Sequence, residues 1–324
     1  MIGKKIIYRL WRMLLILELV GPCYYFLLVW DLFFCSNNAS IFWQKRLENI
    51  ASLNYPRIIR ILYKIYTYKD LNLDNPKSFN ELMQWIKIYD NSPLKTELTD
   101  KYLVREWISK TIGSKYLIPL LGVWDRFDEI DFASLPDAFV LKCNHGCFYN
   151  LVVKNKRELN LKKTKRIFDK WMKTNFAFNT LELQYRDIPR KIIAEKYVEQ
   201  IDGKLLDYKI HVFHGEPKII QVIGDRNFEK HTAKECFFTT TWEIIDVPLH
   251  TYNSYDYIPP KPDNLNEMLS IARTLGKEFR YVRVDLYDLD GEIKFGEMTF
   301  TPASGYARWG GEGTIFSKLM NERE

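Results

Sequence analysis

The chain has 324 residues and a formal net charge of +6, from 47 Lys and Arg against 41 Asp and Glu. Hydrophobic residues make up 47% and charged residues 27%, which is typical of a globular protein and excludes a wholly disordered or collagen-like chain. The charge is uneven, because residues 1–70 hold ten basic and four acidic residues whereas residues 71–324 hold 37 of each. A uniformly basic domain that coats nucleic acid is therefore disfavoured, and we expect no nucleic-acid partner.

An apolar and aromatic segment over residues 13–35 is interrupted by Glu18, a Gly-Pro pair and Asp31. Its length would span a bilayer, which takes about 20 helical residues, but the two carboxylates and the Gly-Pro pair disfavour a straight span. No small-residue cleavage site of a secretory signal follows it. Because basic residues flank both sides, we predict a kinked re-entrant or interfacial helix on the cytoplasmic face of the inner or plasma membrane. The alternative is an apolar helix docked on the body of a cytoplasmic protein.

The five cysteines are odd in number and show no paired framework, which indicates a reducing compartment. The motif Cys143-Asn-His-Gly-Cys147 offers three metal ligands without a partner pair. We therefore favour incidental cysteines over a metal site.

Helical patterns dominate the first half of the chain. Ser78 can cap a helix and Glu81 completes a capping box, so a helix is predicted from there to about Tyr89. A second helix is expected to begin near residues 99–101 and to end before Gly113. The remaining predictions in this half are a helical linker over residues 41–70, strands over 117–123 and 139–143, and a helix with a solvated basic face within 154–173.

From Ile192 onward the pattern changes to strands. Alternating or apolar runs predict strands over residues 192–195, 208–213 and 218–223, with a turn at residues 214–217 between the last two. A helix is predicted over residues 263–280 and a hairpin over 281–301. Strand pairs mixed with helices indicate α+β or α/β architecture with antiparallel sheets in the C-terminal half.

The hairpin carries the most informative polar pattern. Val282, Val284 and Leu286 share one face of the first strand, so Arg283 and Asp285 share the other. A three-residue loop over 289–291 would pair Arg283 with Glu297 and leave Asp285 and Glu297 diagonal, ~7–8 Å apart at Cα and able to share Mg²⁺. A two-residue loop would put the two carboxylates on opposite faces. The alternative is an exposed face with an Arg–Glu pair.

Other short motifs occur in a fixed order before the hairpin: Asp100-Lys101, the strand-ending Lys142, Glu195-Lys-Tyr-Val-Glu199 and Asp207-Tyr-Lys209. With Arg-x-Asp and Glu-x-Thr in the hairpin, this order resembles the ATP-grasp superfamily. More narrowly, it resembles the TupA-like ATP-grasp family linked to cell-surface polysaccharide and teichuronopeptide biosynthesis. The similarity covers roughly residues 70–310, including residues 76–81, 135–146 and 297–305.

The resemblance implies an α+β ATP-grasp fold, in which two α+β subdomains clasp a nucleotide. The apolar N-terminal helical segment precedes this fold in the sequence. The implied domains are a basic apolar membrane-associating leader and linker over 1–70, N-terminal and central subdomains over 71–190, and a C-terminal subdomain with the metal-binding hairpin over 191–324. The implied cofactors are ATP and Mg²⁺.

The resemblance also implies the nucleotide-binding residues. Lys101 and Lys142 would hold the phosphates as point charges, and the Asn144-His145-Gly146 loop would cover them, with Gly146 allowing close backbone approach. Further along the chain, Glu195 would accept from the adenine amino group, the backbones of Lys196 and Val198 would supply the hinge hydrogen bonds, and Asp207 and Lys209 would face the ribose and phosphates.

For the reacting end, the resemblance implies that Asp285 and Glu297 carry Mg²⁺ and that Arg283 stabilises an acyl phosphate or tetrahedral intermediate. ATP-grasp enzymes usually have Asn two residues after the metal-binding Glu, and this chain has Thr299 there. A threonine hydroxyl can bind Mg²⁺ but is a shorter and weaker donor, so this departure bears on a second metal ion.

The implied function is a carboxylate–amine ligase that uses Mg-ATP to form an acyl phosphate for attack by an amine or another nucleophile, in cell-surface polysaccharide biosynthesis. One alternative is a glycosyltransferase acting on lipid-linked saccharide through Asp288-Leu-Asp290, although a hairpin turn before Gly291 explains those aspartates better. The other is a non-catalytic nucleotide-binding module. The expected partners are a small-molecule or glycan acceptor and the membrane surface.

Overall fold

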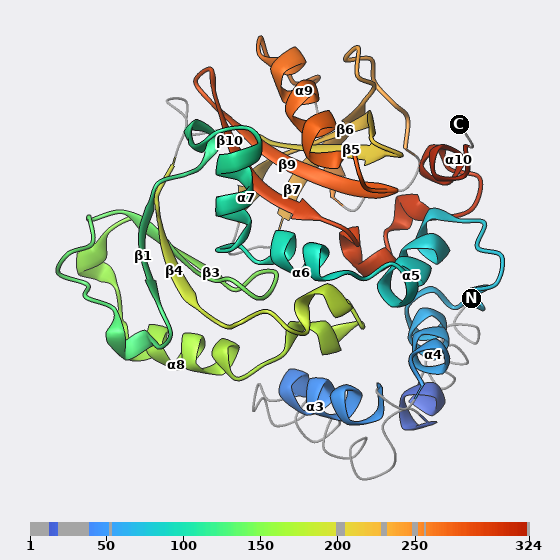
Figure 1. The fold of residues 1–324 in the computed structure, drawn as a ribbon, viewed down its shortest axis with the longest axis horizontal. Helices are drawn as coiled ribbons and strands as arrows, with labels where there is room; N and C mark the ends of the chain where they lie inside the picture. Colours follow the sequence, from blue (N-terminus) through green and yellow to red (C-terminus); the bar gives the residue numbers. More distant parts are fainter. Residues whose placement is uncertain are drawn as a thin grey trace.

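A computed structural model describes residues 13–18, 39–51, 54–198, 205–227, 232–247, 252–255 and 257–322. Two separate β-sheets form its framework (Figure 1). The smaller sheet has the strand order β1-β4-β2-β3, all antiparallel, with β1 at Leu120–Trp124, β2 at Phe139–Cys143, β3 at Asn150–Val153 and β4 at Ile192–Lys196.

The larger sheet has the order β10-β9-β5-β6-β7-β8 and is antiparallel except for the β7–β8 pair. Its strands are β5 at Asp207–Phe213, β6 at Glu216–Asn227, β7 at Thr232–Phe238, β8 at Asn253–Ser254, β9 at Tyr281–Leu289 and β10 at Glu292–Thr299. The predicted antiparallel sheet in the C-terminal half is confirmed.

The described helices include α3 (Ala39–Ala51), α4 (Tyr55–Thr67), α5 (Phe79–Tyr89), α6 (Pro93–Thr99), α7 (Val104–Thr111), α8 (Leu161–Met172), α9 (Leu265–Gly276) and α10 (Ile315–Asn321). Short 3₁₀ turns lie at Ser114–Tyr116, Phe127–Glu129, Lys156–Glu158, Phe176–Asn179, Leu183–Tyr185, Pro302–Gly305 and Arg308–Gly310.

Helix α5 begins as predicted. The Ser78 hydroxyl accepts from the Glu81 backbone N–H, and the Glu81 carboxylate accepts from the Ser78 N–H at 3.0 Å, which completes the capping box. The second predicted helix starts later than expected, at Val104. Asp100 ends α6, and its carboxylate accepts from the backbone N–H groups of Tyr102 and Leu103, so the chain turns once before α7.

Apolar helix faces cover both sheets. Helix α9 packs on one face of the larger sheet, where Leu275 and Met268 meet Ile210 and Val284. The other face is covered in part by α5 and the C-terminal segment, whose Phe79 and Phe316 pack on the strands. Two further cores lie elsewhere: Phe168 of α8 packs under β2 and β4, and Leu47 of α3 and Ile59 of α4 pack with Phe178.

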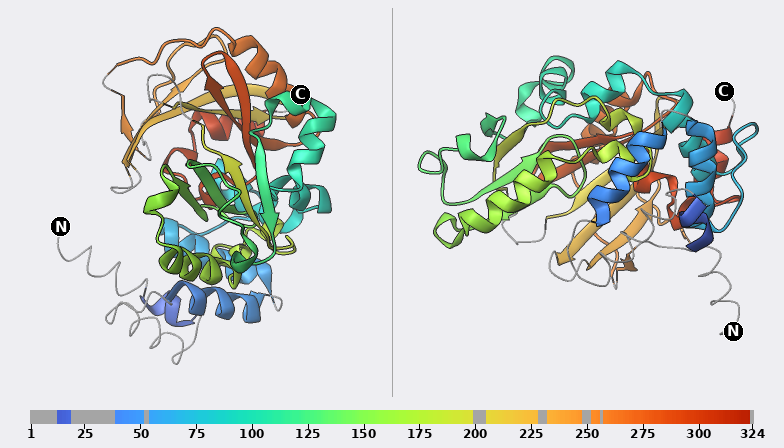
Figure 2. Two further views of the ribbon diagram at one scale, coloured as in Figure 1. Left: turned by 90° about the vertical axis from the view of Figure 1, so that its left-hand side faces the viewer. Right: turned by 90° about the horizontal axis from the view of Figure 1, so that it is seen from below.

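Helices α3 and α8 and the helical residues 13–18 lie at the same end of the molecule (Figures 1 and 2). Most of the predicted apolar segment over residues 13–35 falls outside the described residues. None of the helices in the described ranges has the length and apolar character needed to cross a membrane.

Candidate functional site

The β9–β10 hairpin differs from its predicted register. Leu289 pairs with Glu292, so the loop has two residues, and Asp290 and Gly291 both have positive φ, as in a type I′ turn. The predicted three-residue loop is therefore wrong. A β-bulge between Phe295 and Glu297 adds one residue to β10 and restores the face that a two-residue loop would otherwise reverse.

The bulge brings the two carboxylates closer in register than predicted. Asp285 pairs directly with Glu297, and Arg283 pairs directly with Thr299, so the predicted pairing of Arg283 with Glu297 is wrong. All four side chains share one face of the sheet. Gly296 occupies the bulge, and a Cβ there would lie 3.0 Å from the Asp285 carbonyl oxygen, which leaves little room for a larger residue.

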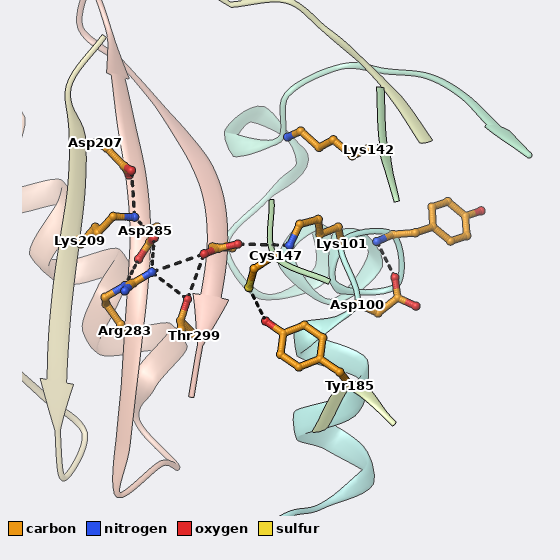
Figure 3. Close-up of polar contacts among 12 residues, drawn as sticks. Asp100, Lys101, Lys142, Cys147, Tyr185, Asp207, Lys209, Arg283, Asp285 and Thr299 are labelled. Atoms are coloured by element: carbon orange, nitrogen blue, oxygen red, sulfur yellow. Dashed lines mark hydrogen bonds and ion pairs between the residues drawn. The ribbon is translucent and has the colours of Figure 1, made fainter. Parts of the chain in front are cut away.

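These side chains form a dense ion-pair cluster with the neighbouring strand β5 (Figure 3). Arg283 holds the Asp285 carboxylate through two hydrogen bonds of 2.6 and 2.8 Å and donates to the Thr299 hydroxyl at 3.0 Å. Lys209 donates to Asp285 and lies 2.9 Å from the Asp207 carboxylate. The predicted residues of β5, β9 and β10 therefore meet in one place, which we call the hairpin cluster (Asp207, Lys209, Arg283, Asp285, Glu297 and Thr299).

Lys101 reaches this cluster from the α6–α7 connection. Its Nζ lies 3.3 Å from Glu297 Oε2, across 196 residues of sequence. Its backbone N–H donates to the Asn144 carbonyl at 3.2 Å, and the Asn144 amide in turn holds the buried Asp100 carboxylate at 2.9 Å. The loop that follows β2 therefore fixes the backbone of Lys101, although Lys101 itself is not part of the smaller sheet.

The charges of this region reinforce one another. Burial favours a neutral Glu297, but the cations Lys101, Lys209 and Arg283 outweigh it and hold the pKa of Glu297 well below its usual range. Burial would lower the pKa of Lys101, and Glu297 outweighs it and raises that pKa instead. Both groups are therefore charged at neutral pH.

The donor set fits Mg²⁺ bound together with a nucleotide. Asp285, Glu297 and Thr299 present oxygen atoms on one sheet face, and Mg²⁺ in phosphate-binding sites is commonly held by one or two carboxylates plus substrate phosphates. Asp285 is 2% exposed and Glu297 is 35% exposed in their side chains, so Glu297 is the more accessible donor. Within the described residues, no group of three or more His, Cys, Asp or Glu side chains is arranged to hold a metal ion.

A second ion-pair group lies on the smaller sheet. Lys142 of β2 is 2.5 Å from one oxygen of Glu195 on β4, and Arg105 of α7 is 2.8 Å from the other. Arg105 also donates to the Ile118 carbonyl at 2.7 Å. Glu195 was predicted to accept from the adenine amino group, but both of its carboxylate oxygens form ion pairs within the protein. We call Arg105, Lys142 and Glu195 the strand triad.

Sequence reasoning missed Arg105. One signal was present: Arg105 follows Lys101 by four residues at the start of a predicted helix, a spacing that places two side chains on one face. This spacing alone does not identify Arg105 as a site residue, because its partner Glu195 lies 90 residues further along the chain.

The loop after β2 is packed tightly. Asn144 is buried, accepts from the Lys191 N–H at 2.7 Å and donates to the Pro189 carbonyl at 2.8 Å. His145 lies 3.1 Å from the Trp171 carbonyl, and burial lowers the pKa of His145 to about 4. Asn144 therefore has a structural role in this arrangement, and His145 is neutral at pH 7.

Two other loop residues differ in exposure. Gly146 is buried, and a Cβ there would meet the Tyr149 ring at 2.7 Å. Phe148 has a φ of +61° and is 86% exposed, so it is the side chain that this loop presents to solvent.

The predicted hinge lies at the end of β4. The Lys196 N–H already donates to the Pro119 carbonyl at 2.9 Å, and Val198 is half-buried. Glu199 lies outside the described residues. In sequence, the predicted hinge follows Glu195 of the strand triad and precedes β5, which carries Asp207 and Lys209 of the hairpin cluster.

The site has a further polar wall that sequence reasoning missed. The Cys147 thiol lies 3.2 Å from the Tyr185 hydroxyl, and burial raises the pKa of Cys147 to about 11, so the thiol is protonated at neutral pH (Figure 3). The negative charge of Glu297 also raises the pKa of Cys147 and the positive charge of Lys101 lowers it, so the thiol lies beside that pair.

The segment after β10 is held by a buried network. Ala303 and Ser304 both have positive φ, an uncommon backbone for residues other than glycine. The Glu182 carboxylate accepts from the hydroxyls of Thr301 at 2.7 Å and Ser304 at 2.6 Å. Lys87 donates to the Ser304 carbonyl at 2.7 Å, and burial lowers the pKa of Lys87 to about 7.

Asp288 is separate from the hairpin cluster, at the tip of the hairpin. Its carboxylate accepts from the Gly291 N–H at 2.8 Å, a bond that closes the turn. This contact gives the Asp288-Leu-Asp290 motif a structural explanation.

A family model described as TupA-like ATPgrasp matches residues 81–312 of the chain. Among curated proteins, none matches the sequence. Similar solved structures include D-alanine–D-alanine ligase from Bacillus anthracis in complex with ATP, at 15% identity over 69% of this chain and 60% of that one, with a TM-score of 0.39. L-amino acid ligase from Bacillus licheniformis has 9% identity over 85% of this chain and 64% of that one, with a TM-score of 0.47. The chain thus spans less than two thirds of each of these ligases.

Proposed function

The chain belongs to the TupA-like ATP-grasp family, and we propose that it is an ATP-dependent ligase that joins a carboxylate to an amine or another nucleophile through an acyl phosphate. One observation carries this proposal. Lys101 converges on Glu297 at 3.3 Å, while Arg283 links Asp285, Glu297 and Thr299 on the same face. Cations and oxygen donors are thus preassembled around a point where phosphate charge could be bound.

In this proposal the nucleotide lies between the hairpin cluster and the strand triad. Lys142 and Lys101 neutralise its phosphates, and Lys196 and Val198 face the base. Mg²⁺, when bound with ATP, would be held by Asp285 and Glu297, with Thr299 beside them, and would neutralise charge on the transferred phosphoryl group. Burial raises the pKa of Asp285, and Arg283 and Lys209 oppose that effect, while the ion pair with Lys209 orients the carboxylate.

The reaction balances without a protein nucleophile. A substrate carboxylate oxygen attacks the γ-phosphorus, and the bond to the oxygen of the leaving ADP breaks. The amine or hydroxyl then attacks the acyl carbon, and the resulting tetrahedral intermediate expels phosphate while the nucleophile loses its proton to solvent. Arg283 is placed to bind the negative charge that develops on the acyl phosphate and on the tetrahedral oxygen.

The test is Mg-ATP binding and acceptor-dependent ADP release. We expect the full chain to bind ATP by calorimetry only when Mg²⁺ is present at comparable concentration, and to release ADP and phosphate with one member of a panel of amino acids, acidic sugars and amino sugars. Failure to bind Mg-ATP would contradict the proposal. Binding without turnover across the panel would favour the nucleotide-binding module instead.

We infer that the acceptor belongs to cell-surface polysaccharide biosynthesis and that the enzyme works on the cytoplasmic face of the inner or plasma membrane. The family resemblance supports the first point, and the basic, apolar N-terminal sequence supports the second. Detergent-free fractionation of the full chain and of a chain that begins at Ala39 tests the location, because the second retains α3 and its buried Leu47. Equal solubility of both would contradict membrane association.

A further inference from the structure

Five basic residues lie on the outer face of α8 and at its C-cap, and we call them the α8 basic face: Lys162, Lys163, Arg166, Lys170 and the C-cap residue Lys173. Thr164 and Phe168 on the opposite side are buried, and Phe168 packs in the core beneath the smaller sheet. At 3.6 residues per turn the five basic residues therefore project away from the sheet. Four of them are exposed and Lys170 is half-buried.

The positive charge around α8 is not apparent from the net charge of residues 71–324, which is zero. Residues 154–173 hold nine basic and two acidic residues, a net charge of +7. The rest of residues 71–324 holds 28 basic and 35 acidic residues, a net charge of −7. The body of the protein is neutral overall, but α8 and the turn before it form a strongly positive pole.

Local acidic residues neutralise little of this pole. Asp128 and Asp169 both pair with Lys165, at 2.5 and 3.2 Å, at the side of the helix. Asp169 is the one acidic residue of α8 itself, and Glu158 lies in the preceding 3₁₀ turn. The α8 basic face keeps a large excess of positive charge toward solvent.

Apolar side chains are exposed at the same end of the molecule. Residues 13–18 lie at that end with α3 and α8 (Figures 1 and 2). Within them, Met13 is 46% and Leu14 is 63% exposed. Reversible membrane binding is strong when a hydrophobic element and a polybasic element act together.

We propose that the α8 basic face docks on the surface of a bilayer that contains anionic lipid, and that it orients the enzyme there. The face is the convex side of one helix, so it suits a flat, charged surface better than a single polyanionic strand, which binds in a groove. Each basic residue near an anionic leaflet contributes about 1 kcal/mol. The inference goes beyond the proposed reaction and does not depend on it.

The experiment measures co-sedimentation of the full chain with vesicles of phosphatidylcholine, with or without phosphatidylglycerol. The variant Lys162→Glu/Lys163→Glu/Arg166→Glu reverses three charges, and we expect its partition onto the anionic vesicles to fall by ~100-fold, from about fivefold per residue. Raising the salt concentration should weaken wild-type binding in the same direction, because exposed charges are screened.

A matched control makes the same charge change elsewhere. Lys110→Glu/Lys261→Glu/Lys277→Glu alters three exposed lysines on α7 and around α9, and we expect its vesicle binding to fall by less than threefold. Equal loss in both variants, no loss in the α8 variant, or no preference of wild type for anionic vesicles would overturn the proposal. So would loss of soluble polyglutamate binding in the α8 variant with vesicle binding intact.

Melting temperature and Mg-ATP binding separate this proposal from the others. Both should be unchanged in the α8 variant, since its three residues are exposed and lie outside the hairpin cluster and the strand triad. A variant that melts normally and binds vesicles like wild type would contradict the role of α8 while leaving the proposed ligase chemistry intact.

Discussion

The hairpin cluster and the strand triad use similar ion pairs but present opposite charges. In the hairpin cluster the buried member is Asp285 and the more exposed one is another carboxylate, Glu297, whose side chain is 35% exposed. In the strand triad the carboxylate of Glu195 is 9% exposed and its cation Lys142 is 25% exposed. The larger sheet therefore presents oxygen donors, and the smaller sheet presents a cation.

This difference explains how two balanced groups can bind a single charged ligand. A metal–nucleotide complex has a cation that requires oxygen donors and phosphates that require positive charge. The ion pairs hold each side chain in place. In each group, the more exposed side chain determines whether the group binds the metal ion or the phosphates. Substitutions that alter one group and spare the other test this comparison.

Asp285→Asn should have the largest effect. Removing one partner of a buried ion pair costs about 3–5 kcal/mol, and here Arg283 and Lys209 would both lose their shared anion. We expect ATP turnover to fall by ~10²–10³-fold, comparable with the removal of an electrostatic group from an active site, and the melting temperature to fall as well. Steady-state ADP release and calorimetry measure the two effects.

The matched control is Asp128→Asn, which removes an exposed carboxylate paired with Lys165. It should leave turnover and melting within experimental error, because exposed pairs contribute about 0–1 kcal/mol. If Asp285→Asn retained a third or more of wild-type turnover, the hairpin cluster would not be the reacting centre.

Gly296→Ala tests the bulge that sets the hairpin cluster apart. A Cβ at Gly296 would lie 3.0 Å from the Asp285 carbonyl and 3.2 Å from the Tyr287 ring, so these neighbours must move by a few tenths of an ångström. A misplacement of about 1 Å can cost ~10²-fold in rate, and for this smaller shift we expect turnover to fall by ~10-fold with ATP affinity nearly unchanged.

Gly311→Ala is the control for the bulge. Gly311 has an ordinary φ of −70°, and a Cβ there meets no atom within 4 Å. Turnover should therefore stay at the wild-type level. Equal behaviour of the two alanine variants would mean that direct pairing of Asp285 with Glu297 is dispensable.

The hairpin shows what the sequence could and could not predict. Alternating residues and the Asp-Gly pair were sufficient to predict two strands and to place Arg283 and Asp285 on one face. The register was not predictable, because the bulge depends on the close approach of Gly296 to the neighbouring strand. The loop is one residue shorter than predicted, and the bulge adds one residue to β10, so the two differences compensate. The carboxylates of Asp285 and Glu297 therefore share a face although the predicted pairing was wrong.

The strand triad was less accessible to sequence reasoning. Lys142 and Glu195 were identified by family resemblance, but their contact joins strands separated by 53 residues, and Arg105 comes from a helix 90 residues before Glu195. Contacts between residues so far apart in the sequence produce no local residue pattern from which they could be predicted. The loop after β2 is similar, because the buried hydrogen bonds of Asn144 depend on Asp100 and Pro189.

Arg105→Gln should have an intermediate effect that separates binding from chemistry. Arg105 holds Glu195, and Glu195 holds Lys142, so it acts as a positioning residue. A hydrogen bond to a charged group contributes about 1.5–3 kcal/mol, and we expect KM for ATP to rise by ~10-fold with kcat nearly unchanged. Initial-rate kinetics over a range of ATP concentrations measure this split.

Two companion variants sharpen the assignment of Arg105. Arg105→Lys should recover part of the affinity, because it keeps the charge but loses the fork that reaches both Glu195 and the Ile118 carbonyl. Lys110→Gln, on the same helix but exposed, should match wild type. A fall in kcat with unchanged KM would place Arg105 in the reacting centre instead.

Asp288→Asn should have the smallest effect, and it compares two aspartates of one strand. Asp285 lies in the hairpin cluster, whereas the Asp288 carboxylate accepts the turn N–H of Gly291 at the tip of the hairpin, and an asparagine oxygen can accept the same bond. We expect turnover within ~twofold of wild type and a stability change below about 0.5 kcal/mol, as for surface substitutions. A glycosyltransferase that used Asp288 and Asp290 to hold its metal ion would instead lose most of its activity. Measured beside Asp285→Asn, a silent Asp288→Asn therefore confines the chemistry to the base of the hairpin, and an inactive one moves it to the tip and favours the transferase.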